Sequence, residues 1–169
     1  MIGTEIITTL CLTAYALGFA NAEEVCRHSD TVVSLSEKYD IEPELIVSLV
    51  YHESRWSPKA KSRAGACGLT QVIPFWVRSP RVTCNQLRNN PKLSLRIGMK
   101  IFNKLLRSKR YANENVKVAL CMYNAGPRNC RFSGVKWRGT SYSRKILKTA
   151  KKFRERMLKF DPKAEDEVF

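Results

Sequence analysis

Hydrophobic residues recur at helical spacing along most of the chain, most clearly near residue 45. Leu45, Ile46, Leu49 and Val50 lie on one face of a helix for which Pro43 suits the first turn. Comparable patterns predict helices over residues 25–39, 91–105, 115–123 and 143–160. Alternating strand patterns are absent, and glycine and proline interrupt residues 57–80, where we expect at most a small hairpin near 65–71. The pattern therefore predicts a mostly α fold.

The first 22 residues differ from the rest of the chain. Residues 6–20 are apolar but short for a membrane span, and they end in Ala20-Asn21-Ala22, a small-residue pattern typical of signal-peptide cleavage sites. The preceding region carries Glu5 and no lysine or arginine, which departs from the usual signal. We therefore expect residues 1–22 to be a signal peptide or a weak N-terminal anchor, and residues 23–169 to form one domain.

Charge changes the picture by indicating a class of partner. The 169 residues include 30 lysines and arginines against 15 acids, a formal net charge of +15. Between Leu45 and Phe160 the only acids are Glu53, Glu114 and Glu155. A basic surface of this kind attracts polyanions such as nucleic acid, an anionic membrane or the bacterial envelope, and it indicates no particular chemistry.

Six cysteines in a chain of this length fit an oxidising compartment. Removal of residues 1–22 would leave five of them, so at most two disulfides would form. Spacing does not determine the pairing; our expectation is Cys121 with Cys130 and Cys26 with Cys84, which leaves Cys67 unpaired. A zinc site is disfavoured because the sequence has no C-x-x-C and no closely spaced histidine pair, and we expect no cofactor.

Glu53 is the most unusual acid in the sequence. It follows Leu49 by four residues and so projects from the buried face, at the C-terminal end of its helix. Apolar surroundings and the negative end of the helix dipole both disfavour the carboxylate and should raise its pKa. A glutamate at a helix end is ordinarily a surface or capping residue, so its function depends on the residues that follow it.

Those residues carry two spaced motifs. Glu53-Ser54 is followed nine residues after the glutamate by Ser62, then by Gly-Ala-Cys-Gly-Leu-Thr-Gln-Val-Ile-Pro over residues 65–74, and residues 123–126 read Tyr-Asn-Ala-Gly. In this order they resemble the motifs of lytic transglycosylases with a goose-type-lysozyme-like fold. The resemblance extends over about residues 25–160. It implies a lysozyme-like helical enzyme that cleaves the glycan strands of peptidoglycan, with the catalytic domain in residues 23–169.

The resemblance also implies roles for individual residues. Glu53 would protonate the glycosidic oxygen and then act as a base. Ser62 and Tyr123 would orient its carboxyl group, while Gln71 and Asn124 would hold sugar substituents.

Two further features of the family pattern bear on the walls of the site. Gly65 and Gly68 would permit a tight backbone turn. A third family motif, Glu-Thr-x-x-Tyr-Val, is weaker here, because residues 138–143 read Arg-Gly-Thr-Ser-Tyr-Ser and lack the glutamate. Tyr142 is therefore a candidate for the wall of the site.

The number of acids indicates the type of reaction. Hydrolysis of a glycoside by the usual route needs two carboxylates, and both Glu114 and Glu155 lie in polar or charged surroundings typical of the surface. A lytic transglycosylase can use one, because the 6-hydroxyl of N-acetylmuramic acid (MurNAc) attacks the anomeric carbon and yields a 1,6-anhydro product. Glu53 would then act as acid and base in turn.

Two alternatives stay open at this point. One is a muramidase, such as an endolysin, that cleaves the same bond with water. The other is a non-catalytic module that binds the envelope or nucleic acid, which the intact set of motif residues disfavours.

The expected partners are peptidoglycan glycan strands and, through basic patches, the anionic envelope surface. We expect no specific nucleic acid and a monomer. The protein should act after export, in the periplasm or at the cell envelope; a phage lysis or virion protein, or a part of a secretion apparatus, is also compatible with the sequence.

Overall fold

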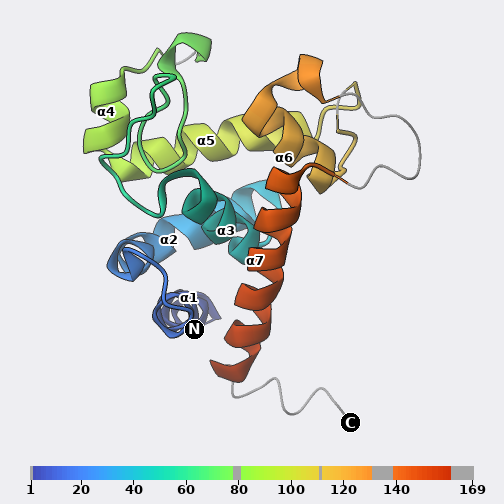
Figure 1. The fold of residues 1–169 in the computed structure, drawn as a ribbon. Coiled ribbons are helices and arrows are strands. Elements are labelled where there is room, and N and C mark those ends of the chain that lie inside the picture. The colour runs from blue at the N-terminus through green and yellow to red at the C-terminus, as the bar shows by residue number, and fades with distance from the viewer. Residues whose placement is uncertain (1, 78–80, 111, 131–138, 161–169) are drawn as a thin grey trace.

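The computed structural model describes residues 2–77, 81–110, 112–130 and 139–160. The acidic C-terminal residues 161–169 and Arg138 of the third motif lie outside these ranges. The helices are α1 (Ile2–Ala16), α2 (Ala22–Tyr39), α3 (Pro43–Ser54), α4 (Cys84–Asn89), α5 (Pro91–Leu106), α6 (Val116–Ala125) and α7 (Ser141–Met157), with 3-10 turns η1 (Pro74–Trp76), η2 (Pro127–Asn129) and η3 (Leu158–Phe160) (Figure 1).

The predicted mostly α fold is confirmed. In place of the small hairpin expected near 65–71, the described residues contain two isolated antiparallel bridges, which join Cys67 to Lys61 and to Val72.

Several helices begin at residues that sequence reasoning can recognise. Pro43 and Pro91 occupy the first turns of α3 and α5, where a missing backbone N–H costs nothing. Helix α4 was not expected. It begins at a capping box, in which the Thr83 hydroxyl accepts from the Gln86 backbone N–H and the Gln86 side chain accepts from the Thr83 backbone N–H.

Helix α3 is the central helix of the main core. Its residues from Leu45 to Val50 are all buried, and it packs against α2 and α7. Just after α3 the Trp56 side chain is fully buried, and its indole N–H donates to the Val47 carbonyl at 3.1 Å. The position of Glu53 at the end of this helix is therefore set by a helix that is buried in the main core.

A second, smaller hydrophobic cluster lies between the motif loop, α4 and α5. Its buried members are Cys67, Val72, Val82, Leu87 and Ile97. In Figure 1 the motif loop and α4 lie side by side, away from α1 and α7, and α5 runs from them toward α6. The cluster gives the motif loop a hydrophobic support of its own.

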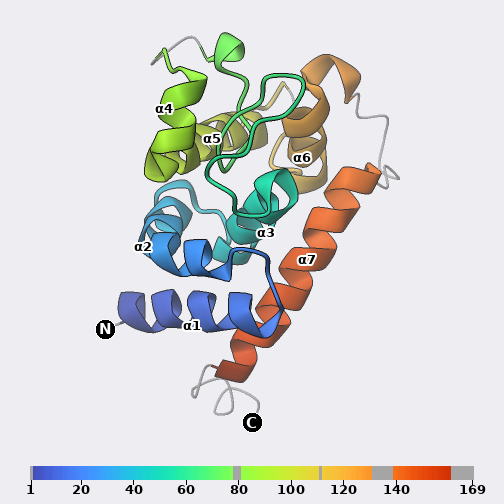
Figure 2. The ribbon, with the colours of Figure 1, turned by 60° about the vertical axis from the view of Figure 1, so that its left-hand side comes forward.

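The N-terminal segment packs on the domain. Helix α1 forms a hairpin with α2 and also contacts α7 (Figure 2). Leu10, Ala14 and Phe19 are buried in the main core, and α2 begins at Ala22, three residues before the predicted start. No helix among the described residues is long and apolar enough to cross a membrane.

Of the two predicted disulfides, Cys121–Cys130 is confirmed and Cys26–Cys84 is wrong. Cys26 on α2 faces α1 and bonds Cys11, whereas Cys67 and Cys84 both belong to the smaller cluster and its edge. Cys67 is therefore not free and Cys84 does not pair with Cys26. The three disulfides are Cys11–Cys26, Cys67–Cys84 and Cys121–Cys130.

Candidate active site

Glu53 lies in the last turn of α3 and its side chain is partly buried. The helix ends because Arg55 and Trp56 both adopt left-handed backbone conformations, with φ of 55° and 58°. The Arg55 N–H caps the helix by donating to the Tyr51 carbonyl at 2.9 Å. Two successive non-glycine residues with positive φ are uncommon, so the backbone next to Glu53 is held in a demanding conformation.

The carboxyl group of Glu53 contacts a tyrosine of α7. The Tyr142 hydroxyl donates a hydrogen bond to Oε1 of Glu53. Burial raises the pKa of Glu53 from 4.5 to about 7, and the Tyr142 hydrogen bond offsets part of that rise. The same burial and the neighbouring Glu53 charge raise the pKa of the Tyr142 hydroxyl, so Tyr142 stays a proton donor. At neutral pH the Glu53 carboxyl can therefore both give and accept a proton.

The motif loop is tied to α5 and α6 through Thr70. Its buried hydroxyl donates to the Ser94 carbonyl on α5 at 2.8 Å. Its own carbonyl accepts from the Tyr123 hydroxyl on α6 at 2.8 Å. Thr70 occupies a variable position of the motif and Ser94 lies in none, so sequence reasoning missed both residues.

Tyr123 lies close enough to Glu53 for the glutamate's charge to act on it. Burial first, and then that charge, raise the pKa of the Tyr123 hydroxyl, which remains protonated. Ser62 is placed differently, because its Oγ accepts from the Ala66 backbone N–H at 3.0 Å within the motif loop. The described hydrogen bond to Glu53 comes from Tyr142, the residue expected only at the wall. The orienting roles of Ser62 and Tyr123 stay predictions.

Gln71 and Asn124 lie on the two elements that Thr70 joins. Gln71 has a positive φ of 48°, is partly buried, and donates from Nε2 to the Gly68 carbonyl at 2.9 Å. Asn124 directly follows Tyr123 in the last turn of α6 and is exposed. Both side chains leave polar atoms for a ligand, and their sugar-binding roles stay predictions.

Gly68 shows why the motif needs glycine. Its φ is +74°, and a Cβ there would lie 2.6 Å from the Leu87 carbonyl oxygen and 2.7 Å from Ser94 Oγ. Gly65 has a φ of +81° with open space around it, so the backbone turn alone favours glycine there.

The other central acids lie on the surface. Glu114 is exposed and pairs with Arg107 at 3.2 Å, and Glu155 is exposed and lies 3.7 Å from Lys151. Within the described ranges, no group of three or more His, Cys, Asp or Glu side chains is arranged to hold a metal ion.

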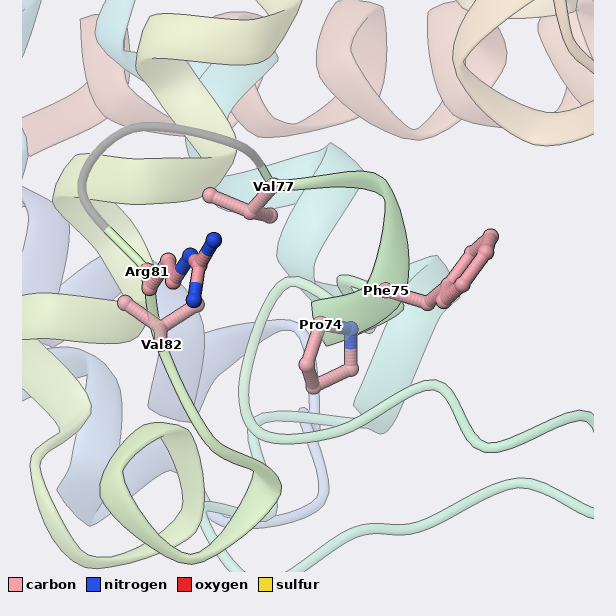
Figure 3. Close-up of a pocket in the computed structure, with 5 residues that line it drawn as sticks. All are labelled: Pro74, Phe75, Val77, Arg81 and Val82. Atoms are coloured by element: carbon pink, nitrogen blue, oxygen red, sulfur yellow. The ribbon is translucent and has the colours of Figure 1, made fainter.

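A pocket of about 590 Å³ lies at the end of the motif. It is lined by Pro74, Phe75, Val77, Arg81 and Val82, and Glu53 is not part of its lining. In Figure 3 the Phe75 ring lies on one side of Pro74, and Val77, Arg81 and Val82 lie on the other. The Phe75 side chain at its edge is 81% exposed.

A mostly α domain with a partly buried glutamate at the end of its central helix has the lysozyme-like architecture that the sequence predicts. The family profile described as "Transglycosylase SLT domain" matches residues 30–149. The chain therefore belongs to this family.

Individual relatives agree with the family assignment. The "membrane-bound lytic murein transglycosylase F" of Vibrio parahaemolyticus is 37% identical over 94 residues, which is 54% of this chain and 17% of the relative. The corresponding protein E of Buchnera aphidicola is 41% identical over 65 residues, 38% of this chain and 29% of the relative. A "transglycosylase" of Enterobacteria phage PRD1 is 29% identical over 119 residues, 70% of this chain and 41% of the relative. The matched part of the chain thus spans less than half of each of these relatives.

Proposed function

We propose that this protein is a peptidoglycan lytic transglycosylase that cleaves the β-1,4 bond between MurNAc and N-acetylglucosamine (GlcNAc), with Glu53 as the single acid and base. The observation that carries the proposal is the Glu53 carboxyl itself: partly buried, hydrogen-bonded by Tyr142, and with its pKa raised to about 7 by burial. Membership of the SLT family and the names of the relatives support the same substrate.

The first step of the proposed reaction uses protonated Glu53. Its proton passes to the glycosidic oxygen as the bond from that oxygen to C1 of MurNAc breaks, and GlcNAc leaves with a 4-hydroxyl. Glu53 is then a carboxylate, which the Tyr142 hydroxyl stabilises through its hydrogen bond.

The second step restores the enzyme. The Glu53 carboxylate takes the proton of the MurNAc 6-hydroxyl. As it does so, the oxygen of that hydroxyl bonds C1 and closes a 1,6-anhydro ring. No water is consumed, and Glu53 ends protonated as it began. A pKa near the working pH suits a group that must act in both directions.

Among the residues that the structure describes, no second acid affects the Glu53 carboxyl, which favours this route over a muramidase. Among the described residues of the central region, Glu114 and Glu155 are exposed and paired with basic side chains. Neither pairs with Glu53, and no other acid contributes to the pKa of Glu53. Hydrolysis needs a second carboxylate beside the first, and the described residues of the central region offer no candidate for it.

The basic surface is proposed to hold the enzyme on the anionic envelope. One face of α7 and η3 carries exposed lysines and arginines, and Glu155 is the only acid between residues 141 and 160. The face begins next to Tyr142, so a polyanion bound along it would lie near the Glu53 site. Its exposed members are Arg144, Lys145, Lys148, Lys151, Lys152 and Lys159.

We further propose that the protein acts after export, as a monomer, in the periplasm or at the envelope. Three disulfides support an oxidising compartment. For residues 1–22 we favour a retained segment over a removed signal peptide, because Leu10, Ala14 and Phe19 are buried and Cys11 bonds Cys26. The similarity to the transglycosylase of phage PRD1 is compatible with a phage origin of this protein as well as with a bacterial one.

The test is mass spectrometry of the fragments released from purified peptidoglycan by the wild-type protein and by Glu53→Gln. We expect anhydro-muropeptides from the wild type and none from the variant. Reducing-end fragments would indicate a muramidase. No release by the wild type would indicate the non-catalytic binding module.

A further inference from the structure

The segment between α1 and α2 contacts the end of α3 that carries Glu53. The Asn21 side-chain amide donates from Nδ2 to the Arg55 carbonyl at 2.9 Å. Two residues earlier, the Phe19 ring stacks on the Tyr51 ring with centroids 4.0 Å apart, and Phe19 is only 9% exposed. Tyr51 and Arg55 lie two residues before and two residues after Glu53. The contacts therefore bracket the catalytic position.

The contact to Arg55 is made where α3 needs a partner. The carbonyls at a helix C-terminus lack intrahelical donors, and Asn21 supplies a donor for the carbonyl of the capping residue. Arg55 and Trp56 also hold the uncommon positive φ values, so a fixed partner there restrains a backbone that would otherwise relax.

The aromatic contact restrains the same turn from its other end. The Arg55 guanidinium lies over the Tyr51 ring, 4.5 Å from its centroid, while Phe19 stacks on that ring. Phe19 also lies 5.5 Å, centroid to centroid, from Phe153 of α7, the helix that carries Tyr142. Phe19 is thus in contact with both helices whose side chains meet at the Glu53 carboxyl.

This segment lies outside the part of the chain that matches the SLT family, which begins at residue 30. It also belongs to residues 1–22, the stretch that resembles a signal peptide. Its contacts therefore join a segment outside the matched range to Tyr51 and Arg55, which lie inside it.

We propose that Phe19 and Asn21 are positioning residues that hold the last turn of α3, through Tyr51 and Arg55, so that the Glu53 carboxyl meets the Tyr142 hydroxyl. The inference rests on the proposed function of Glu53. Small displacements of a catalytic group reduce turnover steeply, so we expect loss of these contacts to lower kcat.

The test compares the full-length wild type with Asn21→Gly. Asn21 has a φ of 58°, which glycine adopts freely, so the substitution removes the side-chain hydrogen bond and leaves the backbone conformation accessible. We expect kcat on a defined glycan to fall by about fivefold or more, the equivalent of one lost hydrogen bond, with KM changed by less than about twofold. Asn113→Gly is the matched control, because Asn113 is exposed and also has a positive φ, of 44°. Its kcat should equal that of the wild type.

The pH profile separates positioning from a general loss of stability. If the Glu53 carboxyl moves away from the Tyr142 hydroxyl, the alkaline limb of the kcat profile shifts to higher pH in Asn21→Gly. A variant that was only less stable would keep the wild-type limb. Phe19→Leu, which keeps an apolar side chain but loses the ring, should shift the limb in the same direction.

Three results would overturn the proposal. One is an Asn21→Gly enzyme with wild-type kcat and pH profile. The second is an equal fall in kcat in Asn113→Gly. The third is an exported, fully active enzyme whose first residue is Glu23, as measured by intact mass. A wild-type protein that released no anhydro product would instead contradict the proposed function, which keeps the two failures distinct.

Discussion

Replacing Glu53 by glutamine is expected to stabilise the protein above neutral pH and to leave its stability nearly unchanged below pH 4.5. The folded protein holds the Glu53 proton up to about pH 7, whereas the unfolded chain releases it near 4.5. The stability that comes from this raised pKa is therefore fully present below 4.5 and is lost as pH rises through 7. Glutamine has the same shape and no charge to bury, so the variant should escape the loss.

The size of the effect follows from the two pKa values. The difference between 4.5 and about 7 corresponds to about 3 kcal/mol of unfolding free energy at about 1.4 kcal/mol per pH unit. For a domain of this size that is a rise of roughly 10 °C in Tm. Because the side chain is only partly buried, this is an upper value for the gain at pH 8.

The assay is denaturant unfolding of the wild type and Glu53→Gln at pH 4.5 and pH 8, with disulfides intact. Glu37→Gln serves as the control, since Glu37 is exposed on α2, and it should show no pH-dependent difference from the wild type. An equal stability of Glu53→Gln and wild type at pH 8 would refute the claim that Glu53 has a raised pKa, and with it the basis for its acid role.

Three further predictions test the surroundings of Glu53. Tyr142→Phe removes a hydrogen-bond donor that favours the Glu53 carboxylate, so the pKa of Glu53 should rise. The alkaline limb of the kcat/KM profile should then move up by about one pH unit. An unmoved limb would show that the hydrogen bond is not made in solution. Gly68→Ala should lower the free energy of unfolding by roughly 3 kcal/mol or more in denaturant melts, because the added Cβ would clash with the Leu87 carbonyl. The control Gly18→Ala, at a position with positive φ and open space, should lower it by only about 1 kcal/mol. Equal losses would mean that the clash relaxes. Binding to intact peptidoglycan sacculi in a pull-down assay should weaken with added salt more than turnover of a short soluble glycan does, because salt screens long-range charge; equal sensitivity would count against a role for the α7 face in docking.

The helices were largely predictable because local signals and burial agree. Pro43 indicates where α3 begins, and the apolar face from Leu45 to Val50 indicates which side of it is buried. The starts of α2 and α7 were predicted three and two residues too late, because helix ends are the least certain part of an assignment. Helix α4 was missed even though its capping box, Thr83 and Gln86, could have been read from the sequence.

The disulfides were predictable only where the chain is nearly closed by local structure. Cys121 and Cys130 are separated only by the end of α6 and the η2 turn, so the chain has a short distance to close between them. Cys11 was set aside with the expected signal peptide, so the true partner of Cys26 was not considered. Pairing over longer separations depends on how helices pack, which spacing does not encode.

The candidate site shows the same division. Glu53 could be identified because its helical phase puts it on a buried face and the motif follows it directly. The hydrogen bond from Tyr142 could not be predicted in the same way, because it joins residues 89 positions apart through the packing of α7 on α3. Thr70 and Ser94 escaped notice because their role is to hold the loop rather than to contact the carboxyl group.

The central claim, that Glu53 works as a single carboxylate without water as a reactant, is tested most directly by digestion in ¹⁸O-labelled water. Peptidoglycan would be cleaved by the wild-type protein at early times and the new MurNAc ends examined by mass spectrometry, with a reducing sugar incubated alongside to measure exchange. The account predicts anhydro ends that contain no ¹⁸O. Incorporation of one ¹⁸O at C1 of each new end, above the exchange control, would contradict it and show that water attacks the bond.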